Sequence, residues 1–116
     1  MRLTMSDTGK TYTEIEGRDS VLTVHDDHIV IKRSGFMAFF DMYAKTGRKE
    51  IPIREITRIE SDHVYIRVRQ RGYSGAGRLD RDLNTIQTSM GQDIDELTSR
   101  LREAISERKQ ALGEIE

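Results

Sequence analysis

The feature that most limits the possible folds is a series of seven short segments of β-strand character, followed by one helical pattern. The segments are rich in Val, Ile and Thr, nearly alternate apolar with polar residues, and lie at residues 12–16, 21–25, 29–32, 50–53, 56–60, 64–69 and 85–90. Most connections are short and polar, as at Asp26 and Asp27. Short turns join antiparallel neighbours, because parallel strands need a crossover of a dozen or more residues. The series therefore predicts an antiparallel meander.

After Gly91 the apolar spacing becomes that of a helix. The apolar residues recur three or four positions apart, or at whole-turn multiples, and form one stripe: Ile94, Leu97, Leu101, Ala104, Ile105 and Leu112. Acidic residues near the start and basic residues near the end suit the helix dipole. We predict one amphipathic helix over residues 92–112, ended by Gly113. Its Leu97 and Leu101 should pack against the apolar face of the sixth strand, made of Val64, Ile66 and Val68.

Together these elements predict a mostly β fold with one α-helix. A seven-stranded antiparallel sheet rolled into an open barrel leaves an apolar end, which a C-terminal amphipathic helix can cap. This is the architecture of a PH-like barrel. We expect the domain to span residues 11–112, after a flexible leader at 1–10 and before a C-terminal tail at 113–116.

The order of several stretches resembles that of small bacterial PH-like domains of unknown function. These stretches are residues 14–17, the hairpin 22–33, the aromatic segment 35–40, and residues 49–59, 84–88 and 97–105. The resemblance covers about four-fifths of the chain, from residue 14 to residue 105. It implies that the connection between the third and fourth strands borders the end where ligands dock. It does not identify a ligand, because one fold supports many functions.

Composition excludes several classes of function. The 19 Lys and Arg nearly balance the 20 Asp and Glu, so the net charge of −1 gives no bulk attraction to nucleic acid or an anionic membrane. The chain has no Cys and so no disulfide, thiol nucleophile or zinc–thiolate site. No apolar run approaches the ~20 residues of a membrane-spanning helix. We expect a cytoplasmic protein, with peripheral attachment to a membrane as the alternative.

No pattern typical of a catalytic centre is visible, such as a nucleophile with its base or paired carboxylates on rigid elements. The glycine-rich stretch 72–77 leads to a strand rather than to a helix, so we interpret it as a hairpin loop. His25 and His28 flank the turn at residues 26–27, but strand alternation argues against their rings converging on a metal. We therefore predict a non-enzymatic protein with no metal, cofactor or small-molecule substrate.

The segment at residues 35–43 contains all three Phe of the chain. Large apolar side chains in a connection either cover the core as a lid or contact a partner. We predict a binding or assembly module that contacts a protein partner or a second copy of the chain through Phe36, Met37, Phe39, Phe40 and Tyr43. At least one of the first four should be exposed. The lid remains the alternative.

Basic residues suggest two further surfaces. Five of them flank the aromatic segment and would meet anionic headgroups at a membrane: Lys32, Arg33, Lys45, Arg48 and Lys49. On the sixth strand a second face carries Tyr65, Arg67 and Arg69, continued by Arg71, and could attract phosphates of lipid or nucleic acid. Nearby acidic residues, including Glu60 and Asp62, are expected to neutralise this face. Nucleic-acid binding is therefore the weaker alternative.

Overall fold

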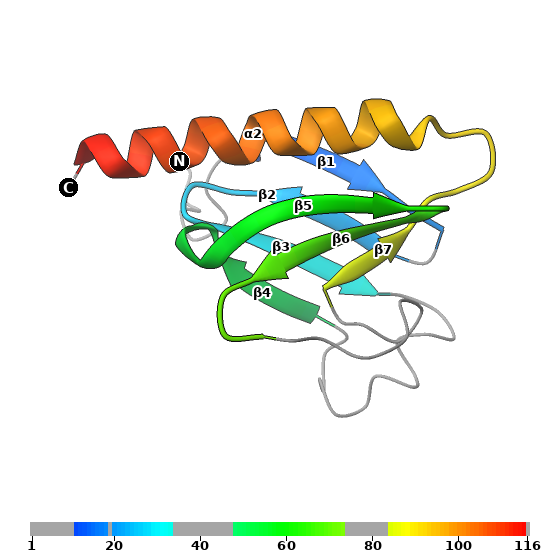
Figure 1. Cartoon of the computed structure of the whole chain (residues 1–116), viewed down its shortest axis with the longest axis horizontal. Coiled ribbons are helices and arrows are strands. Elements are labelled where there is room, and N and C mark those ends of the chain that lie inside the picture. The colour runs from blue at the N-terminus through cyan, green and yellow to red at the C-terminus, as the bar shows by residue number, and fades with distance from the viewer. Residues whose placement is uncertain (1–10, 19, 34–47, 74–83, 116) are drawn as a thin grey trace, which may run out of the picture.

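The computed structural model describes residues 11–18, 20–33, 48–73 and 84–115, with side chains up to residue 113, and these form two antiparallel sheets and one long helix (Figure 1). The first sheet has the order β1 (Thr13–Glu16), β2 (Ser20–Val24), β3 (His28–Arg33) and β4 (Arg48–Pro52). The 3-10 turn η3 (Ile53–Glu55) leads to the second sheet of β5 (Ile56–Asp62), β6 (Tyr65–Gln70) and β7 (Thr85–Gln87). The helix α2 (Ile94–Ile115) follows.

The predicted mostly β fold with antiparallel neighbours and a C-terminal helix is confirmed. Each of the seven predicted strands is present near its predicted place. The described strands, however, form a four-stranded and a three-stranded sheet that are not hydrogen-bonded into one closed barrel. Single contacts join the two sheets instead: the Arg18 N–H donates to Gln87 O at 2.8 Å, beside Gly17. A Cβ atom on Gly17 would clash with that same carbonyl oxygen.

One apolar core lies between the sheets and the helix. Strand alternation places Leu22 and Val24 of β2 and Ile66 and Val68 of β6 in this core, each almost completely buried. The helix contributes the stripe predicted from the sequence, with Leu97, Leu101, Ile105 and Leu112 all buried in the same cluster. The predicted helix stripe and the Ile66 and Val68 side chains of β6 therefore belong to one core cluster.

The helix α2 runs along the two facing sheet edges, β1 and β5 (Figure 1). Its side chains donate hydrogen bonds to backbone carbonyls of both edge strands. On β1, Arg100 Nη2 donates to Glu14 O at 3.2 Å. On β5, Arg102 donates to Ile59 O. An uncovered edge strand invites pairing with another chain, so these contacts protect both edges.

Three details differ from the sequence-based expectation. Val64 is 43% exposed rather than buried, because it lies in the two-residue turn between β5 and β6, where His63 has the left-handed φ of 58°. The strand β7 ends at Gln87, which leaves Met90 fully exposed. The helix continues past Gly113 to Ile115, since Gly113 does not take the positive φ of a helix-ending glycine.

Candidate functional site

The predicted contact residues of the aromatic segment, Phe36, Met37, Phe39, Phe40 and Tyr43, lie outside the described residues, as does Lys45. The structure does describe the two strands that hold the ends of this segment. The strand β3 ends at Arg33 and β4 begins at Arg48, and Lys32 and Arg48 are opposite each other in the ladder. The connection at residues 34–47 therefore starts and ends on adjacent, hydrogen-bonded strands.

We call Lys32, Arg33, Arg48, Lys49 and Tyr73 the loop base, because they lie at or near the ends of the two long connections, 34–47 and 74–83. Arg33 Nη2 donates a hydrogen bond to Thr85 O at 3.0 Å, which links β3 of the first sheet to β7 of the second. The Lys49 Nζ atom lies 4.1 Å from the centroid of the Tyr73 ring, a cation–π contact between β4 and the residues after β6. The loop base thus ties the two sheets together.

The predicted anion-binding residues of this region have partners within the molecule. Besides the contacts of Arg33 and Lys49, Arg48 Nη2 forms an ion pair with Glu50 Oε2 at 2.7 Å. Lys32 is exposed. Arg33 and Lys49 therefore contact segments far apart in the chain, whereas Arg48 pairs with a neighbour on its own strand. Sequence reasoning did not foresee these contacts.

The predicted basic stripe of the sixth strand divides into two parts. Tyr65, Arg67 and Arg69 alternate with the buried Ile66 and Val68 and occupy the outward face of β6, as predicted. Arg71 lies beyond the end of the strand in a turn, is exposed, and donates its backbone N–H to Glu55 O at 2.7 Å. It therefore lies outside the strand that carries the other three.

The outward face of β5 and β6 is an arginine-rich surface centred on one carboxylate, Glu60. Glu60 Oε1 accepts from Arg69 Nε at 2.9 Å, and Glu60 Oε2 pairs with Arg58 Nη2 at 2.7 Å. Burial alone would raise the pKa of Glu60, but the hydrogen bonds and charges of Arg69 and Arg58 outweigh it and hold this pKa below its ordinary value. Glu60 therefore pairs with one arginine of the predicted basic face, Arg69, and with Arg58 of its own strand.

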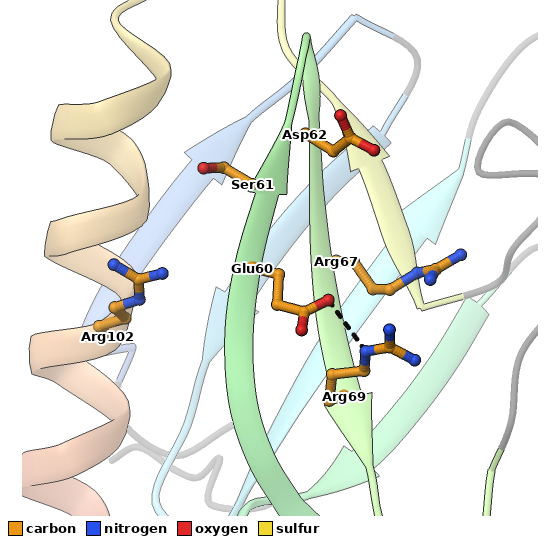
Figure 2. Close-up of a pocket in the computed structure, with 6 residues that line it drawn as sticks. All are labelled: Glu60, Ser61, Asp62, Arg67, Arg69 and Arg102. Atoms are coloured by element: carbon orange, nitrogen blue, oxygen red, sulfur yellow. Dashed lines mark hydrogen bonds and ion pairs between the residues drawn. The ribbon is translucent and has the colours of Figure 1, made fainter.

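An open pocket of about 470 Å³ lies on this face, and six residues of β5, β6 and α2 line it: Glu60, Ser61, Asp62, Arg67, Arg69 and Arg102 (Figure 2). Arg102 reaches it from the helix and is fixed by two hydrogen bonds to Ile59 O, from Nε at 3.1 Å and from Nη2 at 2.8 Å. Sequence reasoning missed Ser61 and Arg102. No local signal marks them, because only the packing of α2 on β5 brings them together.

The two histidines of the β2–β3 turn do approach each other, contrary to expectation. The rings of His25 and His28 stack with centroids 5.0 Å apart, because the two residues oppose each other across the hairpin and so point to the same face. His25 Nε2 contacts Thr23 Oγ1 at 2.9 Å. His28 Nδ1 contacts Asp27 Oδ1 at 2.8 Å and, as the largest contribution, lowers the pKa of Asp27. Among the described residues no three His, Asp or Glu are grouped to hold a metal ion.

Comparisons with family models, curated proteins and solved structures find no match to this chain. Within the described ranges, no helix has both the length and the apolar character needed to cross a membrane.

Proposed function

We propose that this chain is a non-catalytic binding module. Its scaffold is a PH-like open barrel, and the segment at residues 35–43 is its contact surface for a protein partner or a second copy of the chain. The observation that carries the proposal is the loop base, which fixes both ends of the connection containing every Phe of the protein.

The order of elements supports the PH-like scaffold. A meander of four strands is followed by a meander of three and by a C-terminal helix, and the helix covers the edges β1 and β5 (Figure 1). Arg33 and Arg18 supply further links between the sheets through Thr85 O and Gln87 O. These links and the shared core make the two sheets one packed unit.

The loop base supports a binding role for the segment it holds. Binding residues are often found on loops that a rigid scaffold positions, because a fixed base lowers the entropy that is lost on association. The described ladder from His28 opposite Pro52 to Lys32 opposite Arg48 supplies such a base. Its side-chain contacts, Arg33 to Thr85 and Lys49 to Tyr73, add cross-links to the second sheet.

The same contacts favour a protein partner over a membrane. A basic residue near an anionic surface contributes about 1 kcal/mol when its charge faces the headgroups. Arg33, Arg48 and Lys49 already have partners in the molecule, so binding a membrane would compete with these contacts. For nucleic acid, the net charge of −1 supplies no bulk attraction, which makes that partner the weaker alternative. Co-sedimentation with anionic vesicles and a gel-shift assay at low salt test these two alternatives.

The test of the proposal compares two double variants. Phe39→Ser with Phe40→Ser removes two apolar rings from the segment, while Val64→Ser with Met90→Ser removes two exposed apolar side chains elsewhere. We expect the wild type to bind the dye ANS, which reports exposed apolar surface, and to associate with increasing concentration in sedimentation velocity. The Phe variant should lose most of both signals, and the control variant should retain them. Equal signals from the Phe variant and the wild type would contradict the proposal.

A further inference from the structure

We propose that the pocket on the outward face of β5 and β6 binds the phosphate group of a phosphate monoester between the guanidinium groups of Arg67 and Arg69. The residues that line this site belong to β5, β6 and α2 and are separate in the sequence from the segment at residues 35–43. Both arginines line the pocket of about 470 Å³ and come from the same face of one strand. The inference stands apart from the proposed function.

The position of the two arginines suits one compact oxyanion. Residues two apart in a strand point to the same side of the sheet, so Arg67 and Arg69 both lie on the outward face of β6 and line the same pocket. Figure 2 shows both guanidinium groups pointing to the side of Glu60 that faces away from Arg102. Guanidinium groups bind phosphate through paired, charge-assisted hydrogen bonds.

Glu60 positions Arg69 without using its outer donors. The contact runs from Arg69 Nε to Glu60 Oε1, and among the described residues Arg69 Nη1 and Nη2 have no hydrogen-bond partner. The carboxylate thus fixes the plane of the guanidinium and leaves its outer edge to a ligand. Such preorganisation lowers the entropic cost of binding.

The charges around the pocket favour a dianion over a singly charged carboxylate. Three arginines and two acids line it, and both oxygens of Glu60 already accept from Arg69 and Arg58. The lowered pKa of Glu60 reflects the positive surroundings of its carboxyl. Asp62 is exposed, and its Oδ1 atom lies 3.6 Å from His63 Nε2. A dianion gains more from the arginines than a carboxylate does, and its interaction with them offsets the repulsion by Asp62.

The lining of the pocket also indicates what the phosphate is attached to. A volume of about 470 Å³ falls in the range of small-molecule sites and exceeds what a single ion fills. The lining is polar and charged, whereas most drug-like sites are mainly apolar. The ligand is therefore a polar phosphate monoester, either a free small molecule or a phosphorylated side chain of a peptide.

An NMR titration of the full chain with inorganic phosphate, at constant ionic strength, tests the site. We expect saturable shifts of the amides of Glu60, Arg67 and Arg69, and weaker binding of acetate. Glycerol phosphate and a phosphoserine tetrapeptide, titrated in the same way, separate the two sources of the phosphate group by their relative affinities. Shifts that grow linearly without saturation, or acetate binding as tight as phosphate, would overturn the proposal.

The matched variants are Arg67→Gln, Arg69→Gln and Arg71→Gln. Each removes one positive charge from the same stretch of chain, but Arg71 lies outside the pocket lining. Arg67→Gln and Arg69→Gln should each weaken phosphate binding about tenfold, while Arg71→Gln should stay within about threefold of the wild type. A loss with Arg71→Gln as large as with the other two would show unspecific attraction to charge and would exclude the site.

Discussion

Glu60 forms ion pairs with two arginines of the outward face of β5 and β6. It is paired with Arg69 across the β5–β6 ladder and with Arg58 along its own strand. The sequence indicated that acidic residues near the sixth strand would offset the charge of its arginines, because only a short connection separates Glu60 from that strand. It could not indicate which arginines would pair, since that depends on the register of β5 against β6 and on the shift between Ile56 and Arg58.

Replacing Glu60 by Gln should lower the stability by about 0.5–1 kcal/mol at pH 7, the scale of partly exposed ion pairs. The pKa of Glu60 is below its ordinary value of 4.5 in the folded state, so its contribution is present above about pH 5. It is lost as the pH falls through the folded pKa. Urea unfolding should therefore show a difference between wild type and Glu60→Gln at pH 7 that shrinks as the pH is lowered below 4.5. Glu103→Gln, at an exposed helix position, is the control at pH 7 and should keep the stability of the wild type.

Two glycines give opposite predictions for the same substitution. In Gly17→Ala the new methyl group would collide with the backbone oxygen of Gln87, which cannot move away without disturbing the link between the sheets, so we expect a loss of about 1–3 kcal/mol. Gly113 lies in a helix with open space around it, and Gly113→Ala should gain about 0.4–1 kcal/mol. Denaturant midpoints measure both. A neutral Gly17→Ala would contradict the close approach of β7 to the β1–β2 turn.

At the scale of elements, the apolar stripe of the helix α2 could be predicted from the sequence, whereas the hydrogen bonds of its polar side chains could not. Its apolar stripe follows directly from the 3.6-residue period, and the buried residues of the stripe are those predicted. From the sequence, the basic side chains of this helix were expected only to face solvent. Arg100 and Arg102 instead donate to carbonyls of β1 and β5, which carry no side-chain signal in the sequence.

The turns and strand ends were predicted less well than the strands. Alternation extended the sixth strand to Val64, but two residues are needed to reverse the chain between Asp62 and Tyr65. His63 and Val64 form that turn, which moves Val64 out of the core. Hydrophobic pattern alone does not distinguish the last residue of a strand from the second residue of a tight turn.

Truncation of the helix stripe tests how the helix holds the fold. Leu101 is 0% exposed and lies in the shared core, so Leu101→Ala should cost about 2–5 kcal/mol in urea unfolding. Glu103→Ala, on the outer face of the same helix, should change the stability by no more than about 0.5 kcal/mol. If Leu101→Ala is as stable as the parent, α2 does not close the core.

At the scale of the whole molecule, two sheets and a helix share one core, and the loop base joins the sheets near the ends of both long connections. The number, order and antiparallel pairing of the strands could be predicted because short polar turns leave few alternatives. The division into two sheets could not, because it depends on contacts between residues far apart in the sequence, such as Arg33 with Thr85. The candidate pocket could not be predicted for the same reason, because its residues on α2 and β5 are far apart in the sequence and meet only in the folded chain.

The central claim is that residues 35–43 serve binding rather than the stability of the domain. Thermal unfolding of the Phe39→Ser, Phe40→Ser double variant, followed by circular dichroism, tests it most directly. A contact surface predicts a cooperative transition that lies at most several degrees below that of the wild type, because few intramolecular contacts are lost. A lid on the core predicts the loss of two buried rings, at about 3–5 kcal/mol for each large truncation. A double variant that is unfolded at 25 °C would contradict the account.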